Sequence, residues 1–289
     1  MSIDKSARVG AIIKLVAFSV TLVILLAILG VMLVGDIAPV WSFSGVTVKD
    51  FDRYDDTDYA IGDQSYTDNI KNIDVDWVAG SITLEIYDGD AVVIKETGAS
   101  SLDESMRSRV VEDTLSVKFA RSGNLFWSNS ASKDLTVRIP AKIAGELCNI
   151  DISSVSGDVT AVELVCDKLT VVGTSAKIDI SGKVGKLDVA TVSGDVKIVG
   201  TVGEVEMEAV SGSVNVVSDA VPTRVDIETV SGKIIVKVPS TADGFIADLD
   251  SISGNMSCNN VSMRYYKHGD GVARFDFETI SGNVYVSTE

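Results

Sequence analysis

Paired carboxylates recur at a fixed spacing along the second half of the chain. They precede a repeated glycine by six and four residues, as Asp226 and Glu228 precede Gly232. Carboxylate oxygens are ligands that Ca²⁺ takes, and a surface of one charge sign attracts partners of the other. The candidate acidic face comprises Asp188, Glu206, Glu208, Asp226, Glu228, Asp248, Asp250, Asp276 and Glu278. Two interpretations follow: a face that binds calcium or a cationic partner, or a solvated face that keeps the protein soluble.

Residues capable of other chemistry are few and scattered. The single histidine, His268, lies in the sequence YYKHGDG, where we expect a solvated loop. The three cysteines have no metal-ligand spacing. Cys258 is expected to be a small buried hydrophobic residue, whereas Cys148 and Cys166 are 18 residues apart, which leaves a disulfide between neighbouring repeats open. With no catalytic motif and no cofactor motif, we expect the protein not to be an enzyme.

The carboxylates belong to a short repeated unit, which we call a cell. In the cell VDIETVSGKIIV, apolar residues stand seven, five and two places before Gly232, and two and four places after it. Alternation of apolar and polar residues is the period of a half-buried strand, and Ser-Gly permits a local bend. Each cell is therefore predicted to be two strands meeting at a corner, with all five apolar residues inward.

The cells recur with a nearly constant period. The corner glycines are predicted to be Gly80, Gly157, Gly194, Gly212, Gly232, Gly254 and Gly282, and Ala176 takes the same place in one degenerate copy. From Gly157 onward the intervals are 19, 18, 18, 20, 22 and 28 residues. Such a period predicts an all-β parallel β-solenoid of about 18–22-residue coils. An antiparallel sandwich also places strands at regular spacing, but it does not require the same cell in the same phase.

The chain before the cells suggests a membrane anchor. Residues 15–34 form a 20-residue run without charge, which is long enough to cross a bilayer as a helix. Lys5, Arg8 and Lys14 precede it, so residues 1–14 are predicted to be cytoplasmic and the C-terminal domain extracellular. The net charge of −16 is the opposite of what nucleic acid binding requires.

The remaining boundaries follow from composition. Residues 35–70 are rich in aspartate and are predicted to be a solvated linker, because they lack the pattern of an EF-hand loop. Residues 71–289 form the repeat domain, irregular over 71–147 and regular over 148–289. The irregular part has room for about four coils, with strands at 92–95, 115–119 and 135–139 and polar inserts at 98–109 and 121–133. Phe126 and Trp127 in the second insert are candidate exposed aromatics. The last coil has no obvious cap, which predicts end-to-end self-association or a covering partner.

Several stretches resemble a known family of bacterial membrane-anchored, adhesin-like domains of unknown function, built from β-strand repeats. They are DVDWVAGSITL at Asp74–Leu84, LTVRIP at Leu135–Pro140, the VSGDV and VSGKI cells, and IIVKVP ending at Pro239. The resemblance covers residues 70–289 and implies a solenoid displayed on the cell surface, without catalytic residues. Its implied role is adhesion through an envelope polymer or a surface protein; the alternative is an accessory subunit of an envelope-stress sensing system.

Overall fold

The computed structural model describes residues 41–43, 46–48, 58–120 and 132–289 of the chain. Most of these residues lie in β-strands, and α2 (Ala141–Ala144) is a single helical turn, so the prediction of an all-β fold is confirmed. They form two compact units, one spanning residues 38–189 and the other containing residues 190–289. Among the described residues no helix is long and apolar enough to cross a membrane. The predicted anchor at 15–34 lies outside them, as do residues 1–14, Phe126 and Trp127.

In the unit of residues 38–189, repeats pair in parallel around β5 (Asn72–Tyr87). On one side β10 (Asn149–Ser175) pairs in register, with Ile150 opposite Ile73. On the other side β8 (Thr114–Lys118) pairs with the first half of β5, and β9 (Asp134–Pro140) pairs with the second half. β8 and β9 therefore make one further coil. β11 (Ile178–Ser193) begins in this unit, and the short hairpin β1 (Trp41–Phe43) and β2 (Val46–Val48) also belongs to it.

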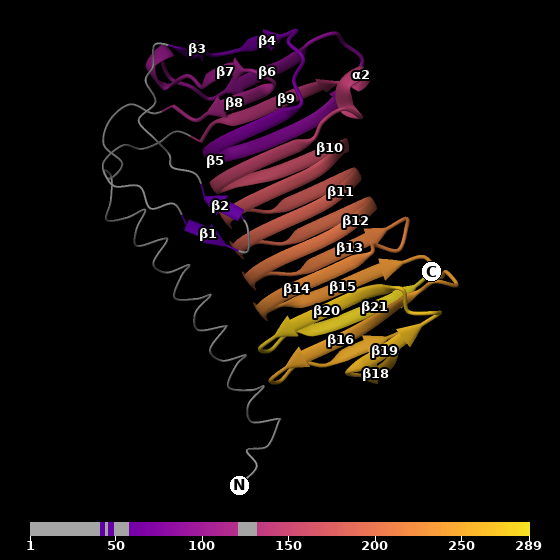
Figure 1. Cartoon of the computed structure of the whole chain (residues 1–289). Helices are drawn as coiled ribbons and strands as arrows, with labels where there is room; N and C mark the ends of the chain where they lie inside the picture. Colours follow the sequence, from indigo (N-terminus) through magenta and orange to yellow (C-terminus); the bar gives the residue numbers. More distant parts are fainter. Residues whose placement is uncertain (1–40, 44–45, 49–57, 121–131) are drawn as a thin grey trace. The chain divides into compact units, whose positions relative to one another are not determined.

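Antiparallel strands cover the outer side of this coil (Figure 1). β7 (Arg107–Val111) pairs with β8, and β6 (Val92–Thr97) pairs with β9. β3 (Ala60–Ile61) and β4 (Gln64–Tyr66) then pair antiparallel with β7 and β6. The three predicted strands of this region are present, but the prediction of about four coils is wrong. Antiparallel strands can be joined by tight turns, so this region folds back locally instead of winding on. The sheet also begins before residue 71, within the predicted linker.

In the unit of residues 190–289, the coils do not stack in sequence order. β12 (Val196–Ser211) pairs in parallel with β13 (Val214–Ser218) and β14 (Arg224–Ser231). β14 and β15 (Lys233–Val238) pair with β20 (Ala273–Thr279) and β21 (Asn283–Thr288). β20 and β21 pair in turn with β16 (Phe245–Ser251) and β17 (Met256–Cys258). The Gly282 coil, yellow in Figure 1, thus lies between the Gly232 and Gly254 coils.

The Gly254 coil is covered by two antiparallel strands. β18 (Val261–Met263) pairs with β17, and β19 (Tyr265–His268) pairs with β16. β18 and β19 therefore form a cap on the Gly254 coil, and the expectation of a loop around His268 is wrong. The expectation of an uncapped last coil is also wrong. The 28-residue interval is long because it contains both cap strands and the return of the chain.

The core consists of the predicted inward residues with one correction. Residues seven and five places before the corner and two and four places after it are buried, as Val225, Ile227, Ile234 and Val236 show at 0% exposure. Residues two places before the corner point outward, and Ile252 is 40% exposed. The residues three places before the corner are buried instead: Ser154, Thr191, Ala209, Thr229, Ser251 and Thr279. The strand alternation runs unbroken to that position and places the next residue outside.

Hydrogen bonds and close backbone approach hold the corners. The hydroxyl of Thr279 accepts the amide N–H of Gly282 at 2.8 Å, and Ser154 accepts that of Gly157 at 2.8 Å. The serine directly before the glycine bonds to the neighbouring coil, as Ser253 donates to the carbonyl of Ile280 at 3.1 Å. Gly232 has φ 143°, and a Cβ there would lie 2.0 Å from a carbonyl oxygen of the coil below. Only glycine fits such a corner.

Candidate functional site

The acidic face predicted from the sequence forms two rows in the unit of residues 190–289. Strand register places the first acidic row in the order Glu206, Asp226, Asp276 and Asp248. It places the second acidic row in the order Glu208, Glu228, Glu278 and Asp250. Neighbouring strands lie about 4.8 Å apart, so each row holds like charges at that spacing on the outer face of β12, β14, β20 and β16.

Arginines neutralise the middle of the first acidic row. Arg224 donates to Asp226 at 2.5 Å, and Arg274 donates to both carboxylate oxygens of Asp276, at 2.8 and 3.0 Å. Both arginines are largely exposed, so these pairs are worth little individually. Each arginine nevertheless places a positive charge beside one of the two central carboxylates of the first acidic row.

Burial and mutual repulsion perturb the second acidic row. Partial burial, followed by the charges of Glu278, Glu208, Asp226 and Glu206, raises the pKa of Glu228 from 4.5 to about 7. The pKa of Glu278 is also raised, first by burial and then by Asp250, Asp226 and Asp276. The physical cause is that water solvates the central carboxylates poorly while neighbours of the same sign surround them. Near neutral pH Glu228 is therefore divided between its protonated and ionised forms.

Asp188 does not belong with these rows. It lies in the unit of residues 38–189, where its side chain is 7% exposed. Lys168 and Lys186 contact it at 2.7 and 3.2 Å. The spacing rule that identified Asp188 is correct, but the rule could not show that two lysines from adjacent coils converge on it. Asp188 therefore contributes a paired, buried charge and no acidic surface.

The other candidate residues take structural positions. In the described part of the chain, no three His, Cys, Asp or Glu side chains are grouped to hold a metal ion, and calcium binding stays a prediction. His268 in β19 lies 5.7 Å from the ring centroid of Phe245 and 3.1 Å from the hydroxyl of Ser240. All three cysteines are free. Cys258 is buried as predicted, and burial raises its pKa to about 11.

The Cys148 and Cys166 side chains do not meet. The backbone N–H of Lys168 donates to the carbonyl of Cys148 at 2.8 Å, which places Cys148 opposite Asp167 in the parallel ladder. The coils are therefore one residue out of the register that would pair the thiols. Cys166 points into the core, where burial raises its pKa to about 12, whereas Cys148 is only partly buried.

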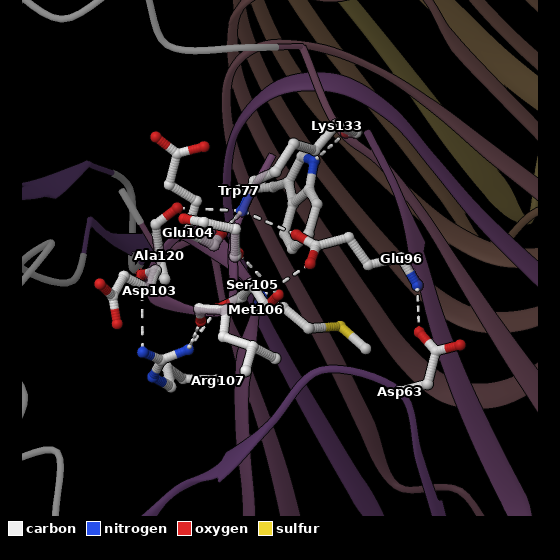
Figure 2. Close-up of polar contacts among 12 residues, drawn as sticks. Asp63, Trp77, Glu96, Asp103, Glu104, Ser105, Met106, Arg107, Ala120 and Lys133 are labelled. Carbon is white, nitrogen blue, oxygen red and sulfur yellow. Dashed lines mark hydrogen bonds and ion pairs between the residues drawn. The ribbon is translucent and has the colours of Figure 1, made fainter. Parts of the chain in front are cut away.

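A buried lysine cluster in the unit of residues 38–189 was missed from the sequence. Figure 2 shows Lys133 against Trp77, with Glu96 facing its ammonium group. Lys133 Nζ contacts Glu96 Oε1 at 2.7 Å, and both side chains are at most 3% exposed. The same ammonium donates to the carbonyls of Glu104 at 2.5 Å and Ala120 at 2.9 Å. The ammonium group thus contacts oxygens of three separate segments and acts as a clamp between them.

Aromatic rings and backbone groups complete this cluster. Lys133 Nζ lies 3.9 Å from the ring centroid of Phe119, and Phe119 packs edge-on against Trp77 at 5.0 Å. The Trp77 indole N–H donates to the carbonyl of Lys133 at 2.8 Å, and Glu96 Oε2 accepts the amide of Met106 at 2.8 Å. Burial lowers the pKa of Lys133, an effect that Glu96 opposes. The sequence contained one signal of this cluster. Trp77 stands three positions before Gly80, where the other cells carry a small residue.

Comparison with known proteins agrees with this repeat architecture. The family model described as Toastrack DUF4097 matches residues 67–287. The chain belongs to the Toastrack DUF4097 family. No curated protein matches the chain.

One solved structure shares the fold at low sequence identity, and others are similar to a lesser degree. A "putative adhesin" from Bacteroides fragilis is 16% identical, with a TM-score of 0.52, and the match covers 78% of this chain and 97% of that one. A "putative cell adhesion protein" from Clostridium sporogenes is 14% identical, with a TM-score of 0.33 and coverage of 80% and 100%. A "Putative lipid binding protein" from Parabacteroides distasonis is 13% identical, with a TM-score of 0.37 and coverage of 81% and 98%. The match of the family model to residues 67–287 confirms the family resemblance predicted from the repeats.

Proposed function

We propose that this Toastrack protein is a non-enzymatic interaction module, held at the membrane by residues 15–34 and displayed outside the cell as a β-solenoid. The observation that carries the proposal is the regular outward display of the two acidic rows on the face of β12, β14, β20 and β16. A flat sheet with charges at a fixed repeat suits an extended, multivalent partner better than a small substrate. The adhesin names of the Bacteroides and Clostridium structures accord with such a role.

The partner we propose is an envelope polymer or surface protein that carries cations or binds through divalent cations. The second acidic row supplies the contact, because the arginines already occupy Asp226 and Asp276 in the first. Calcium that bridges this row to an anionic polymer would relieve the repulsion among its carboxylates. We therefore expect millimolar calcium to raise the melting temperature of the full-length protein.

Co-sedimentation of the full-length protein with cell-wall material, with and without calcium, tests the proposal. The informative variant neutralises the second acidic row by E208Q, E228Q, E278Q and D250N. The matched control removes four exposed carboxylates elsewhere by D88N, E112Q, E146Q and D219N. We expect the row variant to lose binding and the control to retain it. Equal binding by both variants would show that the row is not the contact.

Topology and the sensor alternative are tested in intact cells. A tag placed after Glu289 should be cleaved by external protease if the domain lies outside, and protection of the tag would contradict the proposed display. Recovery of a membrane sensor kinase with the full-length chain, in place of wall material, would favour the accessory role in envelope-stress sensing.

A further inference from the structure

Each unit ends in a layer of two short strands that pair along one edge only within the described ranges. In the unit of residues 38–189 this layer is β3 and β4, which pair with β7 and β6. In the unit of residues 190–289 it is β19 and β18, which pair with β16 and β17. The outer edge of a sheet is a template for another strand, so both layers are candidate interfaces. At the β3 edge the carbonyl of Ile61 accepts the side-chain amide of Gln64 at 3.1 Å, an exposed bond that an incoming strand would replace.

The two edges carry opposite charge. We call residues 58–68 the acidic edge, because it contains Asp58, Asp63 and Asp68 and no lysine or arginine. We call residues 261–268 the basic edge, because it contains Arg264 and Lys267 and no aspartate or glutamate. All five charged residues are exposed. This complementarity favours contact between unlike edges, whereas either edge against itself would oppose like charges.

Strand direction also fits a contact between unlike edges. β3 and β4 follow the direction of the coils, since each is separated from β8 or β9 by one antiparallel strand. β18 and β19 run against the coils. Placed edge to edge, β3 meets β19 and β4 meets β18, both as antiparallel pairs. One docking event therefore extends the sheet on both sides of the corner.

The exposed side chains match in this arrangement. A register that keeps outward residues on the same face puts Ile61, 47% exposed, opposite Tyr265, 57% exposed. The same register puts Tyr66 opposite Val261, which is 55% exposed. Asp63 and Arg264 flank the bend between the strand pairs, where Asp63 also accepts the amide N–H of Glu96 at 2.9 Å and Arg264 donates to the carbonyl of Ser251 at 3.2 Å within their own units. Cross-strand apolar pairs of this kind stabilise a sheet.

We propose that the acidic edge of one copy pairs with the basic edge of a second copy of this chain. Because every copy carries one edge of each kind, the contact is heterologous and each copy can accept a neighbour at both edges. The inference goes beyond the proposed function, since it requires no partner other than the chain itself.

Disulfide cross-linking between two differently tagged full-length chains tests the contact. One chain carries I61C and the other Y265C, both with C148S, while the two buried cysteines are left in place. Directly opposed residues on antiparallel strands have Cβ atoms about 4.5–5.5 Å apart, close enough for a disulfide after small adjustment. The control replaces I61C by V162C, which is similarly exposed in the same unit at 43%.

We expect the I61C chain to form a heterodimer with the Y265C chain, and the V162C chain to form little. The reversals R264E and K267E should reduce the heterodimer about tenfold or more, since like charges at an interface cost several kcal/mol. A melting curve of the reversed chain checks its fold, and R264Q with K267Q replaces it if the fold is lost. Three outcomes would each overturn the proposal. They are an equal yield of heterodimer with the V162C chain, a Y265C homodimer that forms before the heterodimer, and a heterodimer yield that charge reversal does not change.

Discussion

The substitution E228Q should make the protein more stable at alkaline pH and leave it nearly unchanged at acidic pH. Glu228 lies in the middle of the second acidic row, with Glu208 and Glu278 on the neighbouring strands. Glutamine keeps the shape of the side chain and removes the charge. The effect therefore isolates the cost of ionising Glu228 in the folded protein.

The sign follows from the raised pKa. The pKa of Glu228 is about 7 in the folded protein against 4.5 as its ordinary value. Between these values the folded state binds more protons than the unfolded state, so the free energy of unfolding falls as pH rises. The stabilising proton is fully present below pH 4.5, is lost as pH approaches 7, and contributes no further change above that.

The magnitude follows from the same two values. The interval between 4.5 and about 7 corresponds to at most about 3.4 kcal/mol, at 1.36 kcal/mol for each pKa unit. Glu228 is only half-buried, and solvent screening lowers this to about 2 kcal/mol. The difference in unfolding free energy between E228Q and the wild type should thus grow by about 2 kcal/mol from pH 4 to pH 8.

Urea unfolding of full-length protein at several pH values provides the measurement. Far-UV circular dichroism is the suitable signal, because no tryptophan lies in the unit that contains Glu228. E146Q, at an exposed site outside the acidic rows, controls for the loss of one negative charge. A difference that stays constant from pH 4 to pH 8, or that grows toward low pH, would refute the reasoning.

Three further substitutions test other parts of the structure. K133M should destabilise the protein by about 3–5 kcal/mol, because it leaves the Glu96 carboxylate buried without its cation, and the double variant K133M/E96Q should recover part of this loss in the same urea assay. G232A should lower the free energy of unfolding by about 2 kcal/mol or more through its left-handed φ and the contact with the coil below, whereas G145A, where a Cβ meets nothing within 4 Å, should change it little. T279V should cost about 1 kcal/mol by removing the hydroxyl that accepts the Gly282 amide, and an unchanged unfolding midpoint would show that water replaces that bond.

The residues of the core could largely be predicted from their spacing. Alternation identified the inward positions around each glycine, such as Val225 and Ile234, because a strand has a period of two and needs no distant information. It failed at the position two before the corner, where Ile252 is exposed. The prediction placed the bend one residue too early. The geometry of the turn depends on contacts with the neighbouring coil, and the sequence of a single cell does not contain them.

The candidate site was predicted only as a set of residues. Spacing alone grouped Glu206, Asp226 and their equivalents, because residues at the same place in successive repeats come into register when repeats stack. It could not show that arginines neutralise the first acidic row, nor that Lys168 and Lys186 neutralise Asp188. The Lys133–Glu96 pair joins residues 37 positions apart in an irregular region, where no period indicates which side chains meet.

The sequence by itself therefore determined the repeat, its period, the apolar interior and the membership of the acidic rows, all of which follow from local alternation. Tertiary structure alone decided the order of the coils and the caps. The Gly282 coil pairs with the Gly232 coil while β18 and β19 cover the Gly254 coil, although the cells of all three are nearly alike. Similar cells can stack in more than one order. The choice is made by long-range pairing and by the need to cover the open edge of the sheet.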